Sequence, residues 1–118
     1  MLSTPEPIEL LTFFQSEPIE SQPEDGFYVY QVADPEGITL RFSLNELEGS
    51  IQTLLNMHGQ KVAQVSQEGA TRLTLHEDAS GNYLRCDFDQ AAMANSRVEV
   101  RLKPRIMVDW STLLNQRT

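Results

Sequence analysis

The side chains with the greatest chemical potential gather between positions 76 and 89. One imidazole and four carboxylates surround a short turn there: His76, Glu77, Asp78, Asp87 and Asp89. An imidazole with one or two carboxylates is a ligand set for Zn²⁺ or Mn²⁺. Catalytic zinc usually takes three protein ligands, and Arg72 and Arg85 are expected on the same face, where they would pair with the acids. We therefore predict cross-strand ion pairs here and no metal site.

Cys86 is the only cysteine, so no disulfide can form within the chain and a multi-cysteine zinc site is excluded. With His76 or His58 as a base, Cys86 could act as a nucleophile, but a catalytic thiol needs exposed, electropositive surroundings. Cys86 instead falls between Leu84 and Phe88 at an inward position of a predicted strand. We predict that it is a small buried apolar residue.

The serines and glycines form no signature of known catalytic or nucleotide-binding loops. The sequence has no G-x-S-x-G elbow, no G-x-x-x-x-G-K-[ST] loop and no G-x-G-x-x-G loop. We therefore predict no catalytic residue, no cofactor and no enzymatic activity.

A basic run near the C-terminus raises the possibility of nucleic-acid binding. It comprises Arg97, Arg101, Lys103 and Arg105, and Tyr83 or Tyr30 could stack on bases. Glu99 interrupts the run, and the chain as a whole is acidic. A solvated strand face of mixed charge explains the pattern better, so nucleic acid is not an expected partner.

The net charge of −8 is concentrated in the first third of the chain. Positions 1–36 contain no Lys or Arg and eight acids: Glu6, Glu9, Glu17, Glu20, Glu24, Asp25, Asp34 and Glu36. Positions 37–118 contain nine acids and nine Lys or Arg and sum to zero. A segregated field repels nucleic acid and anionic membranes and attracts a basic protein. Solubility alone is the simpler interpretation of the same charge.

Two predicted strands, 27–32 and 38–43, flank Asp34-Pro35-Glu36-Gly37, a sequence typical of a type I turn. The segment 44–58 then carries apolar residues at helical spacing after a Ser43–Glu46 capping box, and Gly59 would end that helix. Further strands are expected at 62–65, 71–77, 83–89 and 96–103, with a possible short strand at 106–108. Thr4 and Asp109 could begin short terminal helices.

These elements predict an α+β fold with an antiparallel sheet of about five to six strands and one main helix, 44–58, packed on one face. Strand alternation turns eight residues toward that helix: Leu73, Leu75, Leu84, Cys86, Phe88, Val98, Val100 and Leu102. We expect an acidic N-terminal segment, 1–26, with a loop at 16–26, and one domain over 27–118. The sequence shows no secretory signal and no run of 18 apolar residues, and a cytoplasmic location is expected.

Seven residues are predicted to contact a protein partner, because they combine the acidic region with the aromatic first hairpin: Glu17, Glu20, Glu24, Asp25, Tyr28, Tyr30 and Glu36. The favoured function is a small acidic protein-interaction module that binds a basic protein. Immunity proteins that inhibit cationic toxins and secretion chaperones share this general profile. Two alternatives stay open: a small-molecule-binding domain or small enzyme with a pocket between helix 44–58 and the sheet, and a structural subunit of a homo-oligomer.

Overall fold

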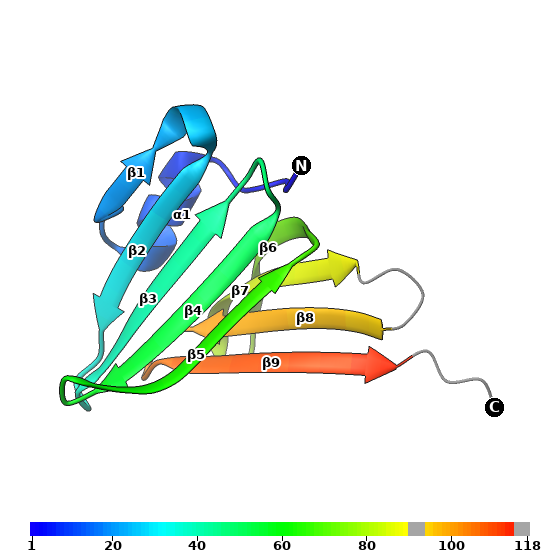
Figure 1. The fold of residues 1–118 in the computed structure, drawn as a ribbon. Helices are drawn as coiled ribbons and strands as arrows, with labels where there is room; N and C mark the ends of the chain where they lie inside the picture. Colours follow the sequence, from blue (N-terminus) through cyan, green and yellow to red (C-terminus); the bar gives the residue numbers. More distant parts are fainter. Residues whose placement is uncertain (90–93, 115–118) are drawn as a thin grey trace.

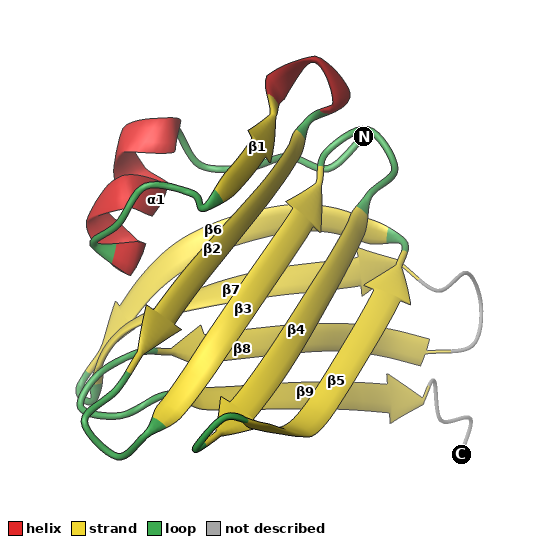
Figure 2. Ribbon diagram, turned by 60° about the vertical axis from the view of Figure 1, so that its left-hand side comes forward, coloured by secondary structure: helices red, strands yellow, loops and turns green. Residues whose placement is uncertain are grey.

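The computed structural model describes residues 1–89 and 94–114 and shows two antiparallel sheets stacked face to face (Figure 1). The strands of one sheet run steeply across those of the other (Figure 2). Five strands in sequential order form the first sheet: β1 (Glu20–Gln22), β2 (Phe27–Ala33), β3 (Ile38–Asn45), β4 (Ser50–Met57) and β5 (Gln60–Glu68). Four more form the second: β6 (Ala70–Asp78), β7 (Gly81–Asp89), β8 (Ala94–Arg101) and β9 (Met107–Leu114).

The chain passes from the first sheet to the second at Gly69, between the end of β5 and the start of β6. Gly69 has a φ of 86°, a conformation that glycine adopts without steric cost. Its carbonyl accepts a hydrogen bond from the Asp89 N–H at 2.9 Å. A tight bend of this kind lets a continuous antiparallel chain turn the corner between crossed sheets.

The core lies between the two sheets and follows the alternation of side chains along each strand. Leu40, Phe42 and Leu44 of β3 and Ile51 of β4 are at most 1% exposed. Leu73, Leu84, Cys86, Val98 and Val100 supply the opposite layer. The inward side of the second sheet was thus predicted correctly, but it faces another sheet and not a helix.

The predicted α+β fold is wrong, because no helix forms at 44–58. Leu44 lies in β3, which ends at Asn45, a four-residue turn follows, and Ile51 lies in β4. The turn is stabilised by Asn45, whose side-chain oxygen accepts the Glu48 N–H at 2.9 Å, and by Gly49 at a φ of 68°. His58 and Gly59, both at positive φ, form the next turn, between β4 and β5. The described residues form nine strands in two sheets, in place of one sheet of five to six.

Other elements agree with expectation more closely. The hairpin of β2 and β3 around Asp34–Gly37 is confirmed, with Tyr30 opposite Phe42. The strands expected at 71–77, 83–89 and 96–103 correspond to β6, β7 and β8. The C-terminal helix expected from Asp109 is wrong, since that residue lies within β9.

A helix does form near the N-terminus, as α1 (Pro7–Phe14), and it is part of the core. Glu6 and Glu9 form its capping box, and Pro7 stands in its first turn, where a missing N–H costs little. Leu10 and Phe14 are 4% and 3% exposed. The preceding segment bridges both sheets, because the Leu2 N–H donates to the Glu46 carbonyl at 2.9 Å and Ser3 pairs with Arg72 of β6. Among the described helices, none has the length and apolar character needed to span a membrane.

Candidate protein-interaction surface

The four acids of the segment 17–25 lie on ordered backbone at the edge of the first sheet. This region was expected to be a loop, but β1 pairs with the start of β2, and the Ile19 N–H donates to the Val29 carbonyl at 2.7 Å. The 3-10 helix η1 (Pro23–Asp25) follows and ends at Gly26, with a φ of 65°. We call Glu17, Glu20, Glu24 and Asp25 the acidic segment; all four are exposed.

The chain's own cations neutralise only part of the N-terminal charge. Glu20 pairs with Arg41 at 2.9 Å, and Glu36 lies 4.0 Å from Arg105. Both pairs are exposed, so each contributes little to stability. Within residues 1–89 and 94–114, Glu17, Glu24 and Asp25 form no ion pair. Glu17, Glu24 and Asp25 therefore present negative charge that a basic partner would meet without displacing a described internal cation, whereas Glu20 is already paired with Arg41.

The other three predicted contact residues, Tyr28, Tyr30 and Glu36, do not form one surface with the acidic segment. Tyr30 is only 3% exposed and its ring stacks on Phe14, with centroids 4.3 Å apart. Burial raises the pKa of the Tyr30 hydroxyl, and Tyr28, Glu17 and Glu46 add to this rise. Tyr30 is therefore a core residue and not a surface contact. Tyr28 is half-buried, and Glu36 lies in the turn at the opposite end of β2 from the acidic segment.

The outer face of the second sheet carries the charges that suggested metal or nucleic-acid binding. The Asp87 carboxylate lies 3.0 Å from Arg85 and 3.7 Å from Arg72, while His76 stacks on Tyr83 at 5.2 Å. His76 and Asp87 therefore have different cross-strand neighbours. No group of three potential metal ligands gathers within the described residues.

The basic run on this face is also engaged by acids. Arg97 lies 3.5 Å from Glu99, and Arg101 forms two hydrogen bonds with Asp78 while its guanidinium lies 4.5 Å from the Tyr83 ring centroid. The hydrogen bonds from Arg101 lower the pKa of the Asp78 carboxyl. This face is one of mixed charge, as expected, and four of its cations lie within 4.0 Å of a carboxylate: Arg72, Arg85, Arg97 and Arg101.

Cys86 lies in the core, fully shielded from solvent, as its inward position predicted. Burial raises the pKa of its thiol to about 12, and the nearby Asp87 charge acts in the same direction. At neutral pH such a thiol is protonated, whereas nucleophilic attack requires the thiolate. Cys86 therefore contributes to packing.

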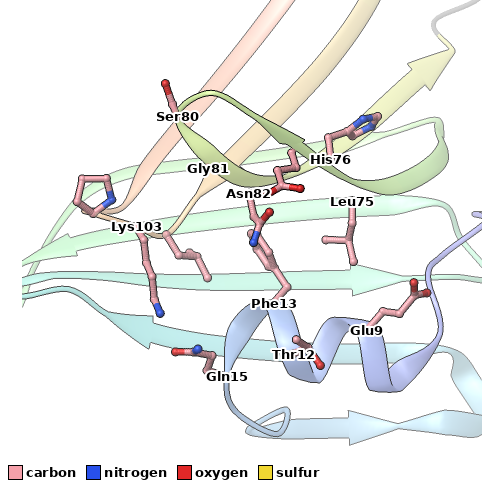
Figure 3. A pocket seen from close by; sticks show the side chains of 13 residues that line it. Glu9, Thr12, Phe13, Gln15, Leu75, His76, Ser80, Gly81, Asn82 and Lys103 are labelled. Atoms are coloured by element: carbon pink, nitrogen blue, oxygen red, sulfur yellow. The ribbon is translucent and has the colours of Figure 1, made fainter.

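A pocket is present, but not where the alternative function required it. The expected position between a helix 44–58 and the sheet does not exist, because those residues form the end of β3, a turn, β4 and the start of the next turn. A pocket of about 660 Å³ instead opens between α1 and the turn that joins β6 and β7 (Figure 3). Sequence reasoning missed its lining residues, which include Phe13 and Lys103. The adjacent pair Phe13-Phe14 was a usable signal, because neighbouring positions on a helix face different directions.

Comparison with known proteins gives one informative result. No family model matches the sequence, and no curated protein matches it. Among solved structures, the chain is similar to a chain of a contact-dependent growth inhibition toxin–immunity protein complex from Klebsiella pneumoniae 342. The TM-score is 0.88 at 26% sequence identity, over 94% of this chain and 96% of that chain. The crossed two-sheet fold is thus shared over almost the full length with a component of a toxin–immunity complex.

Proposed function

We propose that this chain is an immunity-type protein that binds a toxin and has no enzymatic activity of its own. The observation that carries the proposal is the structural likeness to a component of a toxin–immunity protein complex, with a TM-score of 0.88 over 94% of the chain. The acidic segment, which the sequence singled out as a contact for a basic protein, offers the charge for such an interaction.

A toxin–immunity complex has two components, and the features of this chain favour the immunity component. The one thiol is buried and protonated, and His76 is engaged by the Tyr83 ring and by Thr74 at 2.8 Å. The charged side chains of the second sheet are mostly paired with each other. What the chain offers to another molecule is exposed negative charge on an ordered edge. Such a surface suits recognition of a basic partner.

The test is protection and binding measured with one defined toxin. The probe is the toxin domain encoded beside the gene for this chain, expressed from an inducible promoter in cells with and without the chain. We expect growth to be restored only when the chain is present. We also expect the purified components to form a one-to-one complex with a sub-micromolar dissociation constant by calorimetry.

The control is an acidic protein of unrelated fold with the same net charge, which should neither protect cells nor form the complex. Protection by this control would show that charge alone suffices. If the chain itself neither restores growth nor binds the toxin domain, the proposed function is wrong. A cytoplasmic location stays a prediction, which fractionation of the source cells would test.

A further inference from the structure

The pocket beside α1 combines an apolar floor with charged ends. Phe13 of α1, Leu75 of β6 and Leu102 after β8 are partly buried, and each packs against the core. In Figure 3, Phe13 and Asn82 point toward one another across the opening. Glu9 lies at one end, near Leu75, whereas Lys103 and Gln15 lie at the other. Apolar walls with a few polar groups are typical of sites that receive a ligand or an anchoring side chain.

Two carboxylates, Glu9 and Glu77, line this pocket, and Lys103 lies at the end opposite Glu9 (Figure 3). Glu77 lies two residues after Leu75 on β6, opposite Asn82 of β7, and therefore shares the side of the sheet that faces the pocket. Glu9 accepts a hydrogen bond from the Glu6 N–H at 3.0 Å, which leaves its negative charge in place. Neither carboxylate forms an ion pair within the part of the chain that the structure describes. A cationic group entering the pocket would complement both.

The pocket and the acidic segment flank the same helix. Gln15, at the C-terminal end of α1, lines the pocket, and Glu17 follows two residues later. Figure 2 shows α1 beside β1 at one edge of the sandwich, and Figure 3 shows the pocket on the other side of α1. A partner that covers α1 would therefore touch the acidic segment and the pocket together. Binding energy in protein interfaces concentrates in such central pockets, surrounded by polar residues.

We infer that the pocket between α1 and the β6–β7 turn receives an apolar side chain of the bound toxin, with an adjacent basic residue of the toxin directed at Glu9 and Glu77. This inference rests on the proposed function. The pocket volume of about 660 Å³ lies in the range of sites that enclose a ligand or a short peptide segment. The apolar floor supplies affinity by desolvation, and the two carboxylates select a cationic neighbour.

The experiment fills the pocket from either side and compares toxin binding by calorimetry. Asn82→Trp places an indole in the opening from β7, and Thr12→Trp does the same from α1. Val62→Trp is the matched control, because Val62 is 57% exposed on β5, at the opposite edge of the first sheet from β1, and does not line the pocket. We expect both pocket variants to weaken toxin binding by at least about tenfold, and Val62→Trp to leave it unchanged. Circular dichroism and thermal unfolding establish that each variant is folded.

A second experiment tests the negative charges of the pocket separately from its shape. Glu9→Gln and Glu77→Gln keep the size of the side chains, and the double variant should weaken binding by about tenfold if a toxin cation lies between them. If the unmodified chain binds the toxin and folded Asn82→Trp and Thr12→Trp bind it equally well, the pocket inference is wrong and the proposed function stands. If the unmodified chain does not bind the toxin, both fail together.

Discussion

Trp110 of β9 and Thr53 of β4 are joined by a hydrogen bond across the two sheets. The indole Nε1–H donates to the Thr53 Oγ1 at 3.0 Å, and Thr53 is only 2% exposed. Trp110 also packs against Phe88, with ring centroids 5.6 Å apart. The contact links residues 57 positions apart in the chain. It therefore fixes how the second sheet lies over the first.

Thr53→Val keeps the shape of the side chain and removes the acceptor. The indole N–H is then left without its partner, and we expect a loss of about 1–3 kcal/mol in the free energy of unfolding. Urea denaturation followed by circular dichroism measures it. Trp110→Phe and the double variant complete a mutant cycle. If the two single losses simply add in the double variant, the hydrogen bond makes no specific contribution.

Gly49 distinguishes the observed hairpin from the expected helix. In a helix, Gly49→Ala would stabilise the protein by about 1 kcal/mol. In the structure, Gly49 has a φ of 68°, and a Cβ added there would lie 3.0 Å from the Ala70 carbonyl oxygen. We expect Gly49→Ala to lower the free energy of unfolding by at least about 1–2 kcal/mol, because alanine is strained at this φ.

Gly59→Ala is the matched control for this substitution. Gly59 also has a positive φ, of 83°, but an added Cβ would meet nothing within 4 Å. Gly59→Ala should therefore lower the free energy of unfolding only through the strain of alanine at a positive φ. We expect it to be the milder of the two variants in the same denaturation experiment. A stabilising effect of Gly49→Ala would contradict the hairpin.

The segment 44–58 shows why the fold class could not be obtained from periodicity. Leu44, Leu47, Ile51, Leu54 and Leu55 match helical spacing, yet Leu44 and Ile51 also fit the two-residue period of the strands they occupy. Short apolar runs are compatible with both the helical and the strand period. The Ser43–Glu46 pair also matches the capping-box pattern typical of a helix N-terminus, although no helix begins there. The missed signals were the turns at Glu48-Gly49 and His58-Gly59, because glycine after a polar residue is typical of hairpin turns.

Phe14 tests whether the N-terminal helix is an integral part of the protein. The ring is 3% exposed, stacks on Tyr30 and lies 5.7 Å from the Phe42 centroid. Phe14→Ala leaves a cavity in the core, and we expect it to cost about 3–5 kcal/mol. Ile8→Ala on the exposed side of α1 should change stability by no more than about 0.5 kcal/mol. Equal effects of the two substitutions in urea denaturation would show that α1 is not packed as described.

The Asp34 carboxylate makes the stability of the fold dependent on pH in the acid range. Its carboxylate accepts hydrogen bonds from the N–H groups of Ile106, Ile38 and Glu36, at 2.9, 3.0 and 2.9 Å. These bonds, the one from Ile106 first, and the charge of Arg105 hold the pKa of Asp34 below its usual value. The stabilisation is therefore complete above the pKa of the unfolded chain, about 3.9, and is lost as the pH falls through the lower pKa of the folded state.

Asp34→Asn should therefore destabilise the protein at pH 7, and the difference from the unmodified chain should shrink progressively below about pH 4. Thermal unfolding at several pH values measures this. Asp25→Asn is the control, because the Asp25 side chain forms no hydrogen bond within the described residues. A difference for Asp34→Asn that stays constant from pH 7 to the acid limit would contradict the assigned role.

The interaction surface was only partly visible in the sequence. Glu17, Glu24 and Asp25 are exposed and without ion-pair partners in the described structure, and the charge asymmetry that marks them is readable from positions 1–36, which contain no Lys or Arg. Tyr30 was misjudged, because an aromatic residue on a strand looks the same whether it faces solvent or the core. The pocket could not be predicted, since it forms where α1 meets residues 75–82 and 102–104. Contacts so distant in the chain leave no local pattern.

The acidic segment should act mainly on the rate at which the toxin associates. Glu24→Gln/Asp25→Asn removes two exposed charges, and we expect the association rate constant to fall several-fold at low salt. Near 1 M salt the Debye length is only about 3 Å, so the variant and the unmodified chain should associate at similar rates. Glu36→Gln/Asp109→Asn removes the same net charge outside the acidic segment and should have a smaller effect. Stopped-flow measurements over a salt series provide the comparison, and equal slowing by both double variants would show that only total charge matters.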